Sequence, residues 1–320
     1  MLFIISLNKN NMKISLFTLL MLSSFLTFSQ KNESIGVLIL AHGGSEEWNM
    51  LVKQAIDPIK YDYYTEIAFG MANPYTMQKA ISKLEDLGVK KIVVVQLFIS
   101  SFSFIPRQNE YLLGLRESMS QPPIVMSHGV HSTMDHSNHR VKEDPWKHPS
   151  ESFPMLSFSS EIILTDPLND HTLVAEILLE NANKISIDKS KEILLLVGHG
   201  PMKEEDNTQW VLRMESLASR IQSSLPNKER FKMVYSITVR DDADVEIYNQ
   251  AKEQLRMLVR QSSVNNRVLV VPLLLSTGGI EQGIIDRIEG LDYSLSKQAL
   301  LPNPKINEFI LVSVSEALSR

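Results

Sequence analysis

The sequence KEILLLVGHGP (residues 191–201) decides how this chain can fold. Its apolar run is continuous, as is typical of a strand covered on both faces, and it stops at His199 between two glycines. The sequence IGVLILAHG (residues 35–43) repeats the pattern with His42. Because ligands of open α/β sheets bind outside the carboxyl ends of strands, both imidazoles are candidates for a binding site.

Strand-like and helix-like segments alternate around these two stretches. In the first half, further apolar strand candidates cover residues 63–70, 90–99 and 121–127, with amphipathic helical segments between them. In the second half, strand candidates at residues 232–239 and 266–276 follow in the same order. This alternation predicts the α/β class with a doubly wound parallel sheet.

The two halves also match each other segment by segment. WVLRMESLASRIQ, which begins at Trp210, corresponds to WNMLVKQAIDPIK, which begins at Trp48, and the strand candidates around these helices correspond as well. This internal duplication predicts two tandem doubly wound parallel-sheet lobes, the first at residues 34–185 and the second at residues 191–320.

Composition excludes several classes of protein. The formal net charge of −5 argues against a nucleic-acid partner, since neutralising phosphates requires a basic face. The absence of cysteine excludes disulfides, iron–sulfur clusters and thiolate metal sites, so any metal ligand must be His, Asp, Glu or a backbone oxygen. No phosphate-binding G-x-x-x-x-G-K-[ST] motif is present, and we therefore expect no nucleotide cofactor.

The first thirty residues predict an export signal. MKISLFTLLMLSSFLTFSQ (residues 12–30) has a lysine, then an apolar core broken by Ser and Thr, and a small residue, Ser29, where cleavage is expected. The alternative is an uncleaved membrane anchor, for which the apolar core is short. We expect residues 1–30 to be a cleavable signal peptide, and the mature protein to be periplasmic with no stable membrane span.

Two longer segments carry a family resemblance. Together with the paired strand-His-Gly openings, TEIAFGMANPYTMQKAISKLEDLGVKKIVVVQLFIS (residues 65–100) and VLVVPLLLSTGGIEQGI (residues 268–284) resemble the class II chelatase superfamily. The resemblance extends over nearly all of residues 34–290 and is strongest to the sirohydrochlorin cobalt and iron chelatases, with ferrochelatase more distant. It implies two chelatase-like lobes and ATP-independent insertion of a divalent metal ion, Co²⁺, Fe²⁺ or Ni²⁺, as substrate into a sirohydrochlorin-like tetrapyrrole.

The resemblance also implies roles for individual residues. His199 matches the metal-binding histidine of the family, and Glu281 falls on a glutamate of the ferrochelatase pattern, so both are implied as catalytic and metal-binding residues. Gly279 stands where the family often has a histidine, so one expected ligand is missing. We expect His42 to be a second, weaker contact to the metal ion.

Each of these residues also has a structural interpretation. A histidine at a strand end can cap the next helix or bond a carbonyl, and a glutamate in a first helical turn can complement the helix dipole. The same choice, between attracting cations and stabilising a helix, applies to three further acidic groups. These are Glu46 with Glu47 and residues 204–206 after the two histidines, and Asp241, Asp242 and Asp244 after a strand candidate.

A His-rich insertion at residues 126–149 is the compositional outlier. It contains His128, His131, His136 and His139 as possible metal-loading residues. Such tracts gather Zn, Ni, Co or Cu ions loosely. The alternative is a surface insertion whose histidines are incidental.

Two functions therefore stay open. The pair of His199 and Glu281 favours a metal chelatase, because one imidazole and one carboxylate leave the ligand side of the metal open. The export signal favours a non-catalytic protein of the same fold that binds a metal ion, haem or a corrinoid. A metal-dependent hydrolase is a weaker alternative, because the sequence lacks the clustered carboxylates that a two-metal site needs. The sequence does not predict the oligomeric state.

Overall fold

The structure, a computed structural model, describes residues 32–119 and 155–320. The predicted signal peptide, the strand candidate at residues 121–127 and the His-rich insertion with His128, His131, His136 and His139 lie outside the described residues. They stay predictions.

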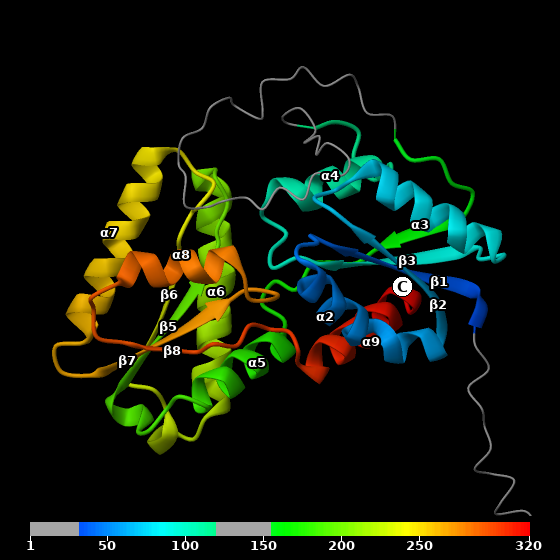
Figure 1. The fold of residues 1–320 in the computed structure, drawn as a ribbon. Coiled ribbons are helices and arrows are strands. Elements are labelled where there is room, and N and C mark those ends of the chain that lie inside the picture. The colour runs from blue at the N-terminus through cyan, green and yellow to red at the C-terminus, as the bar shows by residue number, and fades with distance from the viewer. Residues whose placement is uncertain (1–31, 120–154) are drawn as a thin grey trace, which may run out of the picture.

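The first lobe contains a four-stranded parallel sheet in the order β2-β1-β3-β4 (Figure 1). Its strands are β1 (Asn32–Ala41), β2 (Tyr63–Phe69), β3 (Lys91–Leu97) and β4 (Glu161–Leu164). The helices of this part of the chain are α2 (Glu46–Ile56), η1 (Asp57–Tyr61), α3 (Pro74–Asp86), α4 (Phe104–Leu112) and α5 (Thr172–Asn183).

The second lobe repeats this topology with the parallel order β6-β5-β7-β8. Its strands are β5 (Glu192–Gly198), β6 (Met233–Thr238), β7 (Arg267–Leu273) and β8 (Ser294–Leu295). Its helices are η2 (Lys189–Lys191), α6 (Glu204–Ser224), η3 (Asn227–Glu229), α7 (Val245–Ser262), α8 (Gly279–Ile288) and α9 (Pro304–Leu318). The predicted α/β class with two parallel-sheet lobes is confirmed.

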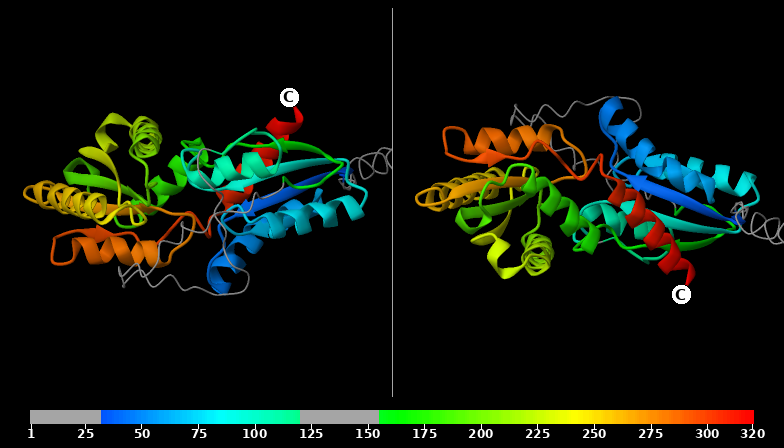
Figure 2. Two further views of the ribbon diagram at one scale, coloured as in Figure 1. Left: turned by 90° about the horizontal axis from the view of Figure 1, so that it is seen from above. Right: turned by 90° about the horizontal axis from the view of Figure 1, so that it is seen from below.

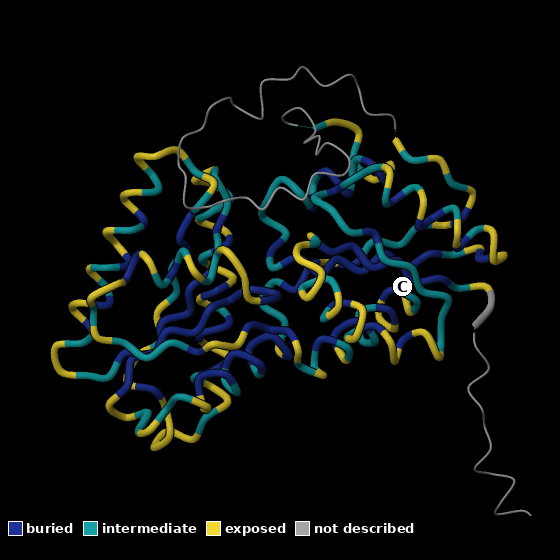
Figure 3. Tube along the Cα trace, viewed as in Figure 1, coloured by how far each residue is buried: buried dark blue, intermediate teal, exposed yellow. Residues whose placement is uncertain are grey.

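Both sheets are buried on both faces, which explains the continuous apolar runs of their strands. On β1, Val37 and Ile39 face one hydrophobic cluster while Leu38 and Leu40 face another. Figure 3 shows the central strands β1, β3, β5 and β7 largely in dark blue and the outer sides of the helices in yellow. The described residues contain no helix long and apolar enough to cross a bilayer.

The last helix of each repeat covers the sheet of the other lobe. Helix α5 contacts α6 and β7 of the second lobe, and helix α9 contacts α2 and β3 of the first (Figures 1 and 2). Hydrogen bonds support this exchange, since the Asn307 side chain donates to Ala55 O and the Asn181 side chain donates to Ala299 O. One hydrophobic cluster therefore runs through both lobes.

The edge strands are the elements that the apolar pattern identified least well. Strand β4 has four residues and β8 has two, and no expected segment covered either of them. Edge strands this short carry too little apolar periodicity to be recognised in a single sequence.

Replacing Ile310 by alanine tests the exchange of helices. Ile310 on α9 is fully buried, so Ile310→Ala is expected to lower the free energy of unfolding by about 2–5 kcal/mol in urea denaturation. Hydrogen exchange is expected to accelerate in β1 and β3, although Ile310 belongs to the second repeat. Val264→Ala, at a side chain that is 73% exposed, is the control. Faster exchange confined to β5 and β7 would contradict the exchanged arrangement.

Replacing Glu192 by glutamine tests the ion pair that this buried carboxylate at the start of β5 forms with the partly exposed Arg267. The Glu192 carboxylate accepts hydrogen bonds from Ser186, from Ile187 N and from Arg267. Burial alone raises the pKa of this carboxyl, but the hydrogen bonds outweigh burial and leave the pKa below its ordinary value. A lowered folded-state pKa adds stability above the unfolded-state pKa of about 4.3, and that stability is lost as the pH falls through the folded value.

We therefore expect Glu192→Gln to reduce stability at pH 7 and to flatten the loss of stability between pH 5 and pH 3, roughly the range in which glutamates titrate. Urea denaturation at several pH values measures both effects. An unchanged pH dependence in the variant would show that Glu192 does not contribute in this way.

Candidate metal site at the carboxyl ends of β5 and β7

His199 and Glu281 follow two neighbouring strands of the second sheet. The chain leaves β5 toward β6 on one side and leaves β7 toward β8 on the other. A switch in direction between adjacent strands leaves a crevice outside their carboxyl ends, which is where open α/β sheets bind ligands. His199 comes directly after β5, and Glu281 lies in the first turn of α8, which follows β7.

The glycine after His199 is required by its surroundings. Gly200 has a φ of +76°, and a Cβ atom there would lie 2.5 Å from the Cβ of Thr238. Glycine, which has no Cβ, can adopt this left-handed backbone conformation and lie this close to the end of β6, whereas a residue with a side chain would clash. The turn after β5 therefore packs tightly against β6 and fixes the backbone that carries His199.

Arg240 holds the rest of this turn. It is only 5% exposed and has a left-handed φ of +54°, which is uncommon for a residue other than glycine. Its backbone N–H donates to His199 O at 2.7 Å, and its guanidinium donates to Pro201 O at 3.0 Å. The same guanidinium donates to Met202 O and pairs with Glu204 at the start of α6.

Asp242, two residues further along, lies beside His199. The distance from Asp242 Oδ2 to His199 Nε2 is 3.4 Å. His199 Nε2 is buried and has no hydrogen-bond partner among the described residues. A buried polar atom without a partner requires an explanation, and a cation shared between the imidazole nitrogen and the carboxylate would satisfy it.

The neighbouring Asp241 connects the same loop to α8. Its carboxylate forms a buried ion pair with Arg287, whose guanidinium lies 4.2 Å from the ring centroid of Tyr248 and donates to Gly283 O at 2.9 Å. Residues 240–242 thus tie the turn that carries His199 to the helix that carries Glu281.

Glu281 is partly buried, and burial raises the pKa of its carboxyl, while the Lys297 charge opposes this. A carboxylate with a raised pKa is a better proton acceptor near neutral pH. Among the described residues, no ion pair joins Glu281 to His199, and no three His, Asp or Glu side chains form a ready metal cage. The structure thus places Asp242, and not Glu281, in contact with His199.

The equivalent histidine of the first lobe has a different environment. His42 is exposed, and its Nδ1 donates to the adjacent Gly43 O at 2.6 Å. No ion pair involves His42 within the part of the chain that the structure describes. The described part of the first lobe therefore has no counterpart of the histidine-carboxylate pair of the second.

Several of the other acidic side chains are occupied by arginines. Glu204 pairs with Arg240, and Asp206 forms a bidentate pair with Arg107 of α4, at 2.9 and 2.6 Å. This second pair joins helices that follow β3 and β5, and so connects the carboxyl edges of the two sheets. Glu46 and Glu47 are exposed in the first turn of α2.

The sequence indicates the two strand ends that carry histidines but not the partner of His199. The only signal for Asp242 was the acidic run after a strand candidate, and such runs more often stabilise the start of a helix. The anchoring role of Arg240 had no sequence signal, because its left-handed backbone and burial arise only in the folded chain.

Comparisons with known proteins agree with this architecture. No family model matches the sequence, and no curated protein matches it. Among solved structures, SirB from Bacillus subtilis with Fe³⁺ has a TM-score of 0.57 at 16% identity, over 90% of this chain and 96% of that chain. CbiX, described as the terminal enzyme for biosynthesis of siroheme in denitrifying bacteria, has a TM-score of 0.51 at 10% identity, over 89% and 99%.

A third structure is a multi-domain protein from Deinococcus radiodurans, described as structurally similar to chelatases and as having two additional domains. It has a TM-score of 0.52 at 14% identity, and the match covers 89% of this chain but 56% of that longer protein. These similarities show that the chain has a chelatase-like fold of two lobes, as the sequence resemblance implied.

Replacing Gly200 by alanine tests whether the turn carrying His199 is as constrained as its geometry indicates. A Cβ in a left-handed conformation costs about 1–2 kcal/mol, and the overlap with Thr238 adds to this, so we expect a loss of about 2 kcal/mol or more in urea denaturation. Gly278→Ala is the matched control, because a Cβ at Gly278 meets no heavy atom of the described residues within 4 Å. Equal losses in the two variants would contradict the constraint.

Proposed function

We propose that this protein is a metal chelatase that inserts a divalent metal ion, Co²⁺ or Fe²⁺, into a sirohydrochlorin-like tetrapyrrole without ATP. The observation that supports this best is the buried Nε2 of His199, which has no hydrogen-bond partner among residues 32–119 and 155–320 and lies beside the Asp242 carboxylate, at a strand-end crevice of a chelatase-like fold. Glu281 on the adjacent α8 is a further candidate ligand and proton acceptor.

The reaction requires a site that holds its metal only weakly. Insertion of M²⁺ replaces two pyrrole N–H protons, so the metal must leave its protein ligands while two protons leave the macrocycle. An imidazole and a carboxylate form a borderline site with open positions, suited to Co²⁺, Fe²⁺ or Ni²⁺. In this proposal His199 and Asp242 hold the ion, and His199 and Glu281 accept protons as the ion transfers.

The alternative function is capture of a metal ion, haem or a corrinoid without turnover. A dedicated metal-capturing site benefits from a closed set of ligands. The described residues contain no group of three candidate ligands, which favours the chelatase.

Turnover measurements on purified protein distinguish these functions. Sirohydrochlorin in excess is mixed with Co²⁺ or Fe²⁺, and the absorbance spectrum is followed over time without ATP. We expect multiple turnovers, with the rate reduced roughly 10–100-fold or more in His199→Ala and Asp242→Asn, the range seen when groups that position metal ligands are lost.

Asp244→Asn is the matched control, because it removes the same charge two residues away, at a side chain that makes no capping hydrogen bond. Its rate is expected to stay close to that of the unmodified protein. A stoichiometric spectral shift without turnover would support the capture function, and turnover that is equal in all variants would place the metal elsewhere.

A further inference from the structure

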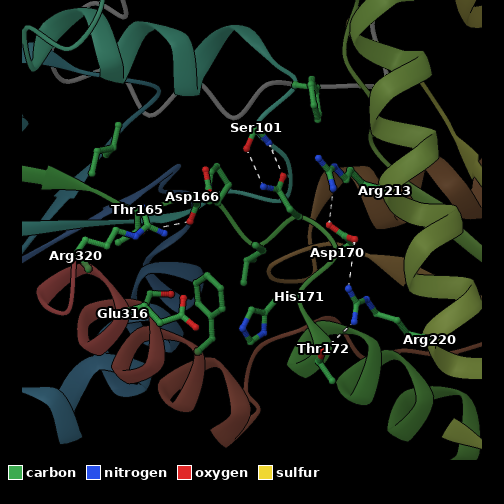
Figure 4. A pocket seen from close by; sticks show the side chains of 18 residues that line it. Ser101, Thr165, Asp166, Asp170, His171, Thr172, Arg213, Arg220, Glu316 and Arg320 are labelled. Atoms are coloured by element: carbon green, nitrogen blue, oxygen red, sulfur yellow. Dashed lines mark hydrogen bonds and ion pairs between the residues drawn. The ribbon is translucent and has the colours of Figure 1, made fainter. Parts of the chain in front are cut away.

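A separate cavity of about 520 Å³ lies where the two lobes meet (Figure 4). It is formed by the loop after β3, the segment between β4 and α5, and the helices α6 and α9. Neither His199, Asp242 nor Glu281 lines it. Its volume is in the range of small-molecule sites, roughly 300–1,000 Å³.

One wall of the cavity has an excess of positive charge. Arg213 and Arg220 reach from α6 toward Asp170, at 3.1 and 3.7 Å, and Ser216 also donates to this carboxylate at 2.6 Å. Two guanidinium groups thus share one carboxylate, which leaves a formal charge of +1. The two arginine side chains are 46% and 45% exposed, so they keep N–H groups that are free to bind a ligand.

His171 adds a neutral hydrogen-bond donor between the two walls. Its Nδ1 accepts a hydrogen bond from Leu173 N at 3.2 Å, so the neutral ring has its proton on Nε2. Its ring stands edge-on to Phe309, with 5.1 Å between centroids. Burial lowers the pKa of His171, which keeps the ring uncharged at neutral pH.

The opposite wall has an excess of negative charge. Asp166 and Glu316 lie there with Arg320, on the far side of the cavity from Arg213 and Arg220 in Figure 4. Two carboxylates with one guanidinium leave a formal charge of −1. Both acidic residues are exposed, so each can meet a ligand without a large cost of dehydration.

From this separation of charge we infer that the cavity binds a small zwitterion of the amino-acid class. Its carboxylate would pair with Arg213 and Arg220, its ammonium group with Asp166 and Glu316, and its carbon chain would lie along His171 and Phe309. This site is independent of the proposed metal site. Because its walls come from both lobes, a bound ligand would stabilise their junction.

Calorimetric titration with a matched set of probes tests this inference. The zwitterions are ω-amino acids of increasing length, from β-alanine to 6-aminohexanoate, and the controls are hexanoate, which has only the carboxylate, and hexylamine, which has only the amine. We expect at least one zwitterion to bind roughly tenfold or more tightly than either control, since each loses one charge-assisted interaction.

Variants then assign the two walls. Arg213→Gln and Glu316→Gln are each expected to weaken binding of the best zwitterion roughly tenfold, whereas Arg260→Gln, at an exposed arginine on α7, leaves it unchanged. Glu316→Gln protects the test against a folding defect, because no ion pair or hydrogen bond involves the Glu316 carboxylate among the described residues. Absence of binding by every zwitterion, equal binding of hexanoate, or insensitivity to Glu316→Gln would overturn the inference.

Discussion

Each four-stranded parallel sheet of this protein must be covered on both faces, and neither repeat covers its own sheet completely. The apolar side chains of β1 and β5 alternate between two faces, and both faces are buried. Helices α5 and α9 close the remaining face of the opposite sheet. Because burial of apolar surface stabilises folding, we expect this exchange to make the two repeats unfold as one cooperative unit. The contacts between the two lobes depend on this exchange of helices.

The exchange also decides where binding sites can form. It holds the carboxyl edges of the two sheets near each other, where the bidentate Arg107–Asp206 pair spans α4 and α6. On the second sheet, the buried Arg240 and the Asp241–Arg287 pair fix the turn after β5 relative to α8. The left-handed backbone at Arg240 is the kind of strained feature that is retained where a site must be held in place. The first lobe has the same topology but leaves His42 exposed, and no carboxylate of the described residues pairs with it.

Much of this fold could be predicted from the sequence, because buried parallel strands are continuous apolar runs and the two repeats resemble each other. The expected strands at residues 63–70 and 90–99 correspond to β2 and β3. The sequence did not predict the short strands β4 and β8, nor that helices α5 and α9 exchange between the lobes. An amphipathic pattern shows that a helix has an apolar face, but it does not show which sheet that face covers.

The sequence predicted one of the two residues of the candidate site. His199 was identified because it ends a strand, and its position after β5 is as expected. The partner of His199, Asp242, was not identified, because its carboxylate reaches the imidazole only through the left-handed backbone at Arg240. The cavity at the lobe junction had no sequence signal, since its charged side chains come from the segment between β4 and α5 and from helices α6 and α9, which are far apart in the sequence.

The central claim is that His199 and Asp242 together bind the metal ion that is transferred. It is tested most directly by titrating Co²⁺ into protein with ¹⁵N-labelled histidine and following the imidazole signals by NMR. The ring signals of His199, assigned by their loss in His199→Ala, are expected to broaden first, and Asp242→Asn is expected to shift that broadening to higher Co²⁺ concentration. Signals of His199 that stay sharp while other histidines broaden would contradict the claim.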